Sequence, residues 1–221
     1  MGPGRLSATG QDASGAPRPA RAGLRARLAQ GSVAAAPGLL GAVVSSDLGG
    51  AHVAVRLTEV EAYREDDPAS HSARGRTART DVMFGPAGRL YVYFVYGMHW
   101  AANVSCGPDG TGEAVLLRAG EVVEGLETAW ARRPAARRAV DLARGPARLA
   151  SVLGLDRSAA GLDLLAPGSP VRLRAGRPVA EVSVGPRVGI SVAVDVPWRW
   201  WATDDPTVSP YRVGGRRRPR S

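Results

Sequence analysis

The chain has 221 residues, of which 44% are hydrophobic and 22% charged, so it can bury a sizeable core and is not disordered throughout. All 29 basic residues are arginine, which excludes catalysis through a lysine Schiff base, and the single cysteine excludes a disulfide framework and cysteine-rich metal sites. The net charge of +9 belongs to the ends, because residues 1–30 carry +4, residues 212–221 carry +5 and the region between them is neutral.

Composition also predicts how the chain is divided. Residues 1–30 are rich in Arg, Gly, Pro and Ala and are interpreted as a disordered tail, residues 31–211 as one domain, and residues 212–221 as a basic C-terminal tail. Such tails attract polyanions, although tails that only improve solubility have the same composition. No apolar run approaches the ~20 residues of a membrane span, and no signal peptide is recognised, so we expect no membrane association and a cytoplasmic location.

The first predicted elements are a short helix and turn within residues 32–46 and a strand over residues 52–63. Along the strand Val53, Val55 and Leu57 share one face, and the same alternation continues that face with Glu59, Glu61 and Tyr63. Burying a carboxylate is costly and raises its pKa unless it is paired, so a glutamate that continues an apolar strand face is unusual. A solvated strand face is the alternative, and the alternation does not choose between the glutamates.

The middle of the chain combines a long polar loop with three strand-like segments. Residues 64–81 have no apolar period, and polar loops of this length are often functional. Residues 89–97 form the most strand-like segment, and residues 100–106 continue it or pair with it. A turn separates them from a strand over residues 113–123, which predicts an antiparallel pair.

Two short helices and several short strands are predicted for the remainder. Residues 124–133 are helical until Pro134, and residues 146–154 begin with Pro and end with Gly, as helices commonly do. Short strands then alternate with turns. The sum predicts a single α+β domain with a mostly antiparallel β core and short helices.

Aromatic residues are unusually concentrated between residues 63 and 99. Although aromatics make up only 5% of the chain, this region holds four of its five tyrosines, both phenylalanines and two of its three histidines. Four of them fall within six residues: Tyr91, Tyr93, Phe94 and Tyr96. A strand that packs its aromatic side chains into the core has this pattern, and so does a platform that stacks a planar ligand such as a base.

Several of these segments, taken in order over most of residues 35–200, resemble the alkyladenine (3-methyladenine) DNA glycosylase family. They are TEVEAY (58–63), His71-Ser72, MFGPAGRLYVYFVYGM (83–98), Asn103, VLLRAGEVVEGLE (115–127), RGPARL (144–149) and RVGI (187–190). The resemblance implies a monofunctional enzyme that flips an alkylated or deaminated purine out of duplex DNA and hydrolyses its N-glycosidic bond, which starts base excision repair. It also implies a fold similar to the C-terminal domain of formyltransferases.

The resemblance implies roles for individual residues. Glu61, rather than Glu59, would be the general base that activates a water molecule, and Arg118 would bind the same water together with a main-chain carbonyl near Ala69. A carboxylate also stabilises the oxocarbenium-like sugar that forms when the base departs. The absence of lysine agrees with a hydrolytic enzyme that uses no amine nucleophile.

The remaining implied roles concern the base and the DNA helix. The flipped base would be enclosed by Tyr63, His71 and Tyr93. Asn103 would crowd the exocyclic amino group of guanine and so help to reject normal bases. Tyr96 would fill the gap left in the helix, with Met98 beside it.

The implied partner is double-stranded DNA with damaged purines, bound by a monomer that needs no metal or cofactor. Residues 132–148 carry a local charge of +5 and are expected near the DNA backbone, with a solvated helix face as the alternative. The acidic residues 65–67 are expected to point away from DNA. The alternative functions are a catalytically inactive lesion- or DNA-binding module of the same fold and, more remotely, a transferase that uses a formyl-type cofactor.

Overall fold

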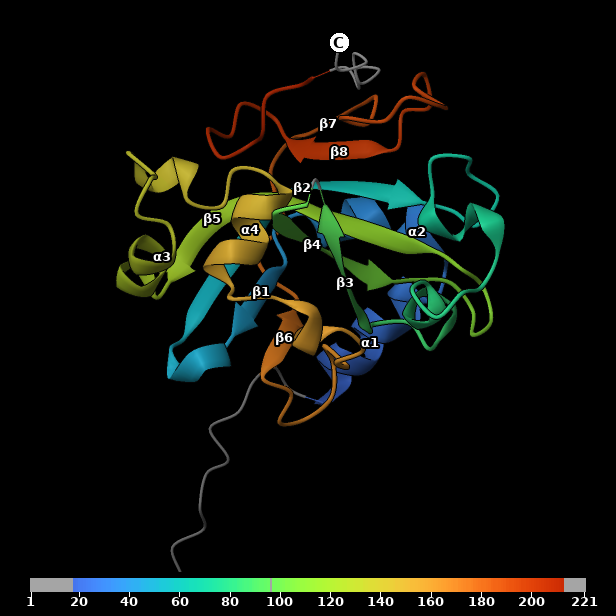
Figure 1. The fold of residues 1–221 in the computed structure, drawn as a ribbon, viewed down its shortest axis with the longest axis horizontal. Coiled ribbons are helices and arrows are strands. Elements are labelled where there is room, and N and C mark those ends of the chain that lie inside the picture. The colour runs from blue at the N-terminus through green and yellow to red at the C-terminus, as the bar shows by residue number, and fades with distance from the viewer. Residues whose placement is uncertain (1–17, 96, 213–221) are drawn as a thin grey trace, which may run out of the picture.

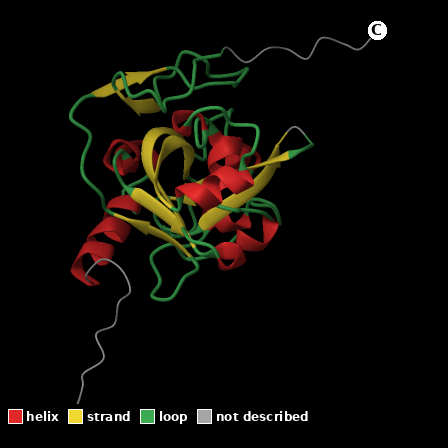
Figure 2. Cartoon of the chain, turned by 90° about the vertical axis from the view of Figure 1, so that its left-hand side faces the viewer, coloured by secondary structure: helices red, strands yellow, loops and turns green. Residues whose placement is uncertain are grey.

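Eight strands form one antiparallel sheet in the computed structural model, which describes residues 18–95 and 97–212 (Figure 1). Six of them lie in the order β3-β4-β5-β2-β1-β6, and the hairpin of β7 and β8 joins the sheet through the pairing of β8 with β2. Figure 2 shows that this hairpin lies to one side of the other strands. The strand bounds are β1 Val43–Ser46, β2 Val53–Tyr63, β3 Leu90–Val95, β4 His99–Ser105, β5 Ala114–Glu124, β6 Val171–Arg174, β7 Val182–Gly185 and β8 Arg199–Ala202.

Short helices pack against this sheet. α4 packs on β4 and β5, α2 packs on β2 and β5, and α3 contacts α4. The α-helices are α1 Arg18–Leu28, α2 Ser32–Ala35, α3 Leu126–Arg132 and α4 Pro146–Val152. One-turn 3-10 helices occupy several connections, namely η1 Ala36–Leu39, η2 Leu48–Gly50, η3 His71–Arg74, η4 Asp81–Phe84, η5 Ala139–Asp141 and η6 Arg157–Ala159. The architecture confirms a single α+β domain with an antiparallel sheet and short helices. None of the helices described is long and apolar enough to cross a membrane.

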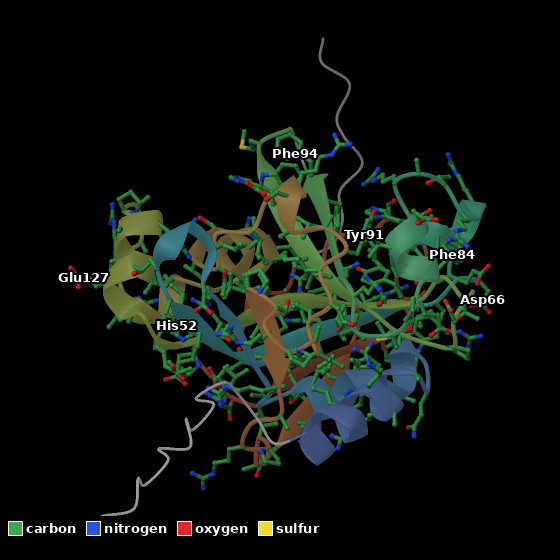
Figure 3. The ribbon with its side chains drawn as sticks, turned by 90° about the horizontal axis from the view of Figure 1, so that it is seen from below. His52, Asp66, Phe84, Tyr91, Phe94 and Glu127 are labelled. Atoms are coloured by element: carbon green, nitrogen blue, oxygen red, sulfur yellow. The ribbon has the colours of Figure 1, made fainter. Side chains whose placement is uncertain are left out.

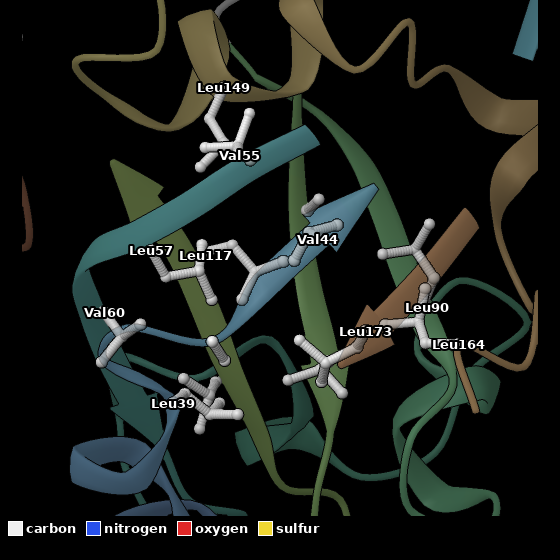
Figure 4. Close-up of a cluster of buried hydrophobic side chains, with 14 of the residues drawn as sticks. Leu39, Val44, Val55, Leu57, Val60, Leu90, Leu117, Leu149, Leu164 and Leu173 are labelled. Carbon is white, nitrogen blue, oxygen red and sulfur yellow. The ribbon is translucent and has the colours of Figure 1, made fainter. Parts of the chain in front are cut away.

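The main hydrophobic core lies between the long central strands and the helices (Figure 4). Leu57 of β2 and Leu117 of β5 are fully buried in it, as is Leu149 of α4. Removal of this apolar surface from water is the main force that holds the helices to the sheet. The two long strands β2 and β5 lie at the centre of the sheet and pair along most of their length. Core packing and strand pairing together make this the rigid part of the sheet.

Most of the predicted elements are confirmed. The segments predicted as strands at 52–63, 89–97, 100–106 and 113–123 are β2, β3, β4 and β5, with β3 antiparallel to β4 and β4 antiparallel to β5. Gly97, with a φ of 70°, provides the left-handed conformation needed where the chain turns from β3 into β4. Residues 32–39 are helical as predicted, whereas residues 43–46 form β1 because they pair with both β2 and β6.

The predicted alternation along β2 is wrong beyond Leu57. Val60 and Ala62, not the glutamates, continue the core-facing side of the strand. The register between β2 and β5 shifts between Leu57 and Glu59 and again before Val60. Such a β-bulge re-aims the side chains that follow it. Glu59, Glu61 and the tyrosine after them therefore face away from the main core.

Helix α1 lies inside the segment predicted to be a disordered tail. Leu24 and Leu28 are buried in the main core, and Arg25 Nη2 donates to the Asp163 carboxylate at 2.8 Å. Composition indicated a tail because only two leucines, four residues apart, mark the buried side of an arginine-rich helix. The packed domain therefore begins before Ser32. Residues 1–17 and 213–221, which make up the rest of the two predicted tails, lie outside the described residues.

Candidate active site

A cavity of about 1010 Å³ opens at one side of the sheet. Strands β3, β4 and β5 contribute Tyr93, Asn103 and Arg118 to its lining. Much of the remaining lining comes from segments that are distant in the sequence, chiefly residues 68–71, 144–148, 188–192 and 209–210, which are loops except for the starts of η3 and α4. The cavity therefore joins the rigid centre of the sheet to several loops, which is a common arrangement for a ligand site.

Glu61 is a fully buried carboxylate beneath this cavity. Its Oε2 accepts a hydrogen bond from the Tyr63 hydroxyl at 2.9 Å and from Arg118 Nη1 at 3.3 Å, and its Oε1 accepts one from the Val188 N–H at 2.7 Å. Burial raises the pKa of Glu61 above its ordinary value, and the charge of Arg118 only partly offsets that effect. A carboxylate with a raised pKa next to a cavity is suited to accept a proton.

Glu59, the other carboxylate on this strand, has a different environment. Its Oε1 accepts hydrogen bonds from Arg118 Nε at 2.9 Å and Arg199 Nε at 2.7 Å, and Ser209 supplies two further donors. Burial alone raises the pKa of Glu59, but the charges of Arg118 and Arg199 outweigh burial and hold it below its usual value. Neither Glu59 nor Glu61 is itself part of the cavity lining. The lowered pKa and the four donors make Glu59 an ionised, fully hydrogen-bonded carboxylate near neutral pH.

Aromatic rings form one wall of the cavity. His71 and Tyr93 meet edge to face with their ring centroids 4.6 Å apart, and Tyr91 stacks on Tyr93 at 5.3 Å. His71 Nδ1 lies 3.0 Å from the Tyr91 hydroxyl, and Tyr63 lines the cavity from β2. Burial of the ring, together with the positive charge of Arg79, lowers the pKa of His71 to about 4. His71 is therefore neutral near pH 7.

Asn103 projects from β4 into the same cavity. It is 4% exposed, and its Oδ1 has no hydrogen-bond partner among the described residues. An unpaired buried amide oxygen costs free energy unless a ligand or water pairs with it. The side chain is thus placed to make a polar contact with a molecule bound in the cavity.

The hairpin of β3 and β4 carries two large apolar side chains that are exposed, and one of them, Phe94, also lines the cavity. Met98 is 69% exposed and Phe94 is 49% exposed, and Phe94 packs on Trp100 with ring centroids 4.8 Å apart. Figure 3 shows Phe94 near the outer end of the hairpin and Tyr91 deeper in the molecule. Tyr96 lies outside the described residues.

The loop between β2 and β3 is anchored by an ion pair that sequence reasoning missed. Arg187 is fully buried and pairs with Asp67, donates to the Ala62 carbonyl at 3.0 Å, and lies over the Tyr63 ring at 4.7 Å. Ala69, two residues after Asp67, lines the cavity, but the main-chain group that donates to Glu61 is the Val188 N–H. In the sequence, only the family resemblance singles out the RVGI segment (187–190), because a loop that contributes a main-chain group has no distinctive side-chain signature.

The acidic stretch 65–67 is used within the fold. Glu65 Oε2 accepts a hydrogen bond from the Gly112 N–H at 2.9 Å, Asp66 pairs with Arg64 at 3.0 Å, and Asp67 belongs to the buried pair just described. In Figure 3, Asp66 lies at the outer edge of the molecule, away from Phe94. Each of the three consecutive carboxylates therefore has a hydrogen-bond or ion-pair partner within the fold.

The arginine-rich stretch 132–148 is divided between structural and cavity positions. Arg132 donates to the carbonyls of Leu48 and Val152, so its charge supports the packing of α3. Arg144 and Arg148 line the cavity together with Asp141. Only part of the predicted charge excess therefore faces the cavity.

The part of the chain that the structure describes offers no set of ligands for a metal ion. Within residues 18–95 and 97–212, no group of three or more His, Cys, Asp or Glu side chains is placed to hold a metal ion. Cys106 is buried, and burial raises the pKa of its thiol. The polar groups available at the cavity are therefore carboxylate, guanidinium, imidazole, phenol and amide.

Comparison with known proteins identifies the class to which this arrangement belongs. The sequence model of the methylpurine-DNA glycosylase family matches residues 26–206. The chain therefore belongs to this family and is a DNA glycosylase, a hydrolase that acts on N-glycosyl bonds in DNA repair.

Individual relatives agree with this assignment. A protein of Nocardia farcinica is 53% identical over 190 residues, which cover 82% of this chain and 88% of the relative. A Streptomyces avermitilis protein is 52% identical over 191 residues, covering 84% and 90%. A Mycobacterium tuberculosis H37Rv protein is 50% identical over 195 residues, covering 86% and 94%. All three carry the name "Putative 3-methyladenine DNA glycosylase".

Proposed function

We propose that the protein removes alkylated or deaminated purines from double-stranded DNA, with Glu61 as the general base of the hydrolysis. The buried carboxylate of Glu61, raised in pKa and hydrogen-bonded by Arg118 and Tyr63, is the observation that carries this proposal. In its ionised form Glu61 takes a proton from water as the water attacks the anomeric carbon. The same negative charge stabilises the oxocarbenium-like sugar as the base leaves.

Arg118 has two tasks in this proposal. Its guanidinium orients the Glu61 carboxylate and binds the attacking water, with the Ala69 main-chain carbonyl as the second water ligand. The position of both residues on the cavity lining supports this arrangement. Since water is the nucleophile and the chain has no lysine, the product is an intact abasic strand and a free base.

The aromatic wall would receive the flipped base. Tyr63 would stack on one face of the base and the rings of His71 and Tyr93 would close the other side, which requires the neutral histidine that the lowered pKa provides. Asn103 would meet the edge of the base, where the amino group of guanine collides with it. The position of Asn103 on the cavity lining supports a contact with the base at this point.

DNA would lie across the open side of the cavity. Tyr96 would take the place of the extruded nucleotide with Met98 beside it, and the exposure of Met98 on the β3–β4 hairpin supports that position. Arg144 and Arg148 on the cavity lining would contact phosphates. We propose that the enzyme acts as a cytoplasmic monomer and needs no cofactor. The proposed likeness of its sheet to the C-terminal domain of formyltransferases concerns the fold alone.

The test is base release from a duplex with one hypoxanthine, followed by alkali to cleave abasic sites. Strand breaks should appear only after alkali. Glu61→Gln should lower the single-turnover rate by about 10²- to 10⁴-fold, the usual contribution of general base catalysis, and should still bind abasic DNA. Glu127→Gln, an exposed change on α3, is the matched control.

Three outcomes would contradict parts of the proposal. A Glu61→Gln enzyme with an unchanged rate would remove Glu61 from the mechanism. Strand cleavage before alkali would show that the enzyme is not monofunctional. Tight binding without release of hypoxanthine, ethenoadenine or methylated bases would favour a lesion-binding module.

A further inference from the structure

Glu59 is the most heavily hydrogen-bonded buried carboxylate next to the proposed general base. It is fully buried, and its two oxygens receive Arg118 Nε, Arg199 Nε, and both the N–H and the hydroxyl of Ser209, at 2.7–3.0 Å. A buried anion is tolerated only when it is paired and hydrogen-bonded to this degree. Glu59 is therefore a fixed negative charge just behind the cavity lining, next to Arg118 and Ser209.

Arg118 is held by three of its nitrogens. Its Nε donates to Glu59 at 2.9 Å, its Nη1 to Glu61 at 3.3 Å, and its Nη2 to the Ser209 hydroxyl at 3.2 Å. The shorter of its two carboxylate contacts is the one with Glu59. One guanidinium is thus shared by two carboxylates, and its orientation is determined mainly by Glu59 and Ser209.

We propose that Glu59 is a positioning residue for catalysis, a permanent anion that fixes the Arg118 guanidinium at Glu61 and at the same time withholds part of its charge from Glu61. This inference rests on the proposed role of Glu61 as general base. Without Glu59, Arg118 would pair fully with Glu61 and make it a weaker base. With Glu59, Arg118 orients Glu61 while leaving it basic.

The other titratable groups around Glu59 and Glu61 agree with the proposal that the two carboxylates share the charge of Arg118. Glu61 is approached by Tyr63 and Tyr93, whose pKa values are both raised, so they remain neutral. Glu59 is approached by a second arginine, Arg199, which lies over the Trp201 ring at 4.4 Å and over the Tyr211 ring at 5.9 Å. Because Arg199 provides a second positive charge at Glu59, Glu59 stays ionised while Arg118 remains free to interact with Glu61 as well.

The decisive experiment compares the acid limb of the pH–rate profile between variants. Single-turnover excision of hypoxanthine is measured from pH 4.5 to 9 for the full chain and for Glu59→Gln. Because glutamine removes the neighbouring negative charge and frees Arg118 for Glu61, the midpoint of the acid limb should fall by about one pH unit. The plateau rate should also fall, by about tenfold, since Arg118 loses its main anchor.

Two further variants separate charge from packing. Glu59→Asp keeps the anion with a shorter reach, so its plateau rate should fall while the acid limb stays in place. Arg199→Gln leaves Glu59 more dependent on Arg118, which should move the acid limb to higher pH, opposite to Glu59→Gln. Arg199→Gln therefore also provides a test if Glu59→Gln does not fold.

The inference is overturned if neither Glu59→Gln nor Arg199→Gln moves the acid limb, or if both move it in the same direction. Failure of the underlying function has a different signature. In that case Glu61→Gln keeps its rate, whatever the profiles of the Glu59 variants show.

Discussion

We call the buried group of Glu59, Glu61 and Arg118, which lies at and just behind the cavity lining, the floor of the cavity. It differs sharply from the outer end of the β3–β4 hairpin, although both belong to the same sheet. In the floor, Glu59, Glu61 and Arg118 are almost completely buried, and each is held by several hydrogen bonds. At the hairpin end, Phe94 and Met98 are apolar yet exposed. Charge is therefore inside and hydrophobic surface outside, the reverse of the usual distribution in a folded domain.

The two regions therefore depend on different interactions. The floor depends on the rigid pairing of β2 with β5 and on loops that fold over it, so a change there propagates through shared hydrogen bonds. The hairpin end has few internal partners, so a change there affects mainly what binds to it. Substitutions in the two regions should consequently differ in both size and kind.

The largest effect is expected where the packed interior extends into the predicted tail. Deleting residues 1–30 removes α1 with Leu24 and Leu28, each of which is buried, and should cost at least ~4 kcal/mol of the free energy of unfolding. Deleting residues 1–17 keeps α1 and is the matched control. Urea unfolding of the two truncated chains measures the difference, and equal midpoints would show that α1 does not stabilise the domain.

A smaller effect should separate the aromatic wall from the hairpin end. Tyr93→Ala removes a ring that would stack on the flipped base and should weaken binding of a lesion duplex by about 10- to 100-fold. Met98→Ala removes an exposed side chain and should weaken it by no more than about threefold. Fluorescence anisotropy with lesion and undamaged duplexes provides the measurement. Equal losses for the two variants would mean that the wall and the hairpin end bind DNA alike.

The smallest effect concerns the proton on His71. Its folded pKa of about 4 lies below its ordinary value of 6.5, so between these pH values the unfolded chain binds the proton and the folded chain does not. Stability from this residue is therefore complete above pH 6.5 and decreases as the pH falls toward 4. NMR titration of the His71 ring, assigned with His71→Gln, should give a midpoint near 4. A midpoint near 6.5 would show that burial and the charge of Arg79 do not lower the pKa of the His71 ring.

Local sequence patterns were sufficient for much of this fold. The strands β2 to β5 and the helices α3 and α4 occur where apolar periods, turns and a proline or glycine place them. The β-bulge after Leu57 and the burial of α1 were not predictable in this way. A bulge depends on the register of a partner strand sixty residues away, and α1 is buried only because distant surfaces cover its two leucines.

For the candidate site, sequence by itself determined the chemical groups, the resemblance on which their proposed roles rest, and the concentration of aromatic residues around residues 63–99. Only the tertiary structure decided how the two glutamates differ. Glu59 and Glu61 are two residues apart on one strand, and nothing local distinguishes them. Arg199, Ser209 and Val188 come from more than a hundred residues away, and these long-range contacts give Glu59 a lowered pKa and Glu61 a raised one. The physical reason is that a buried carboxylate takes its charge state from whichever donors and charges the folded chain brings to it.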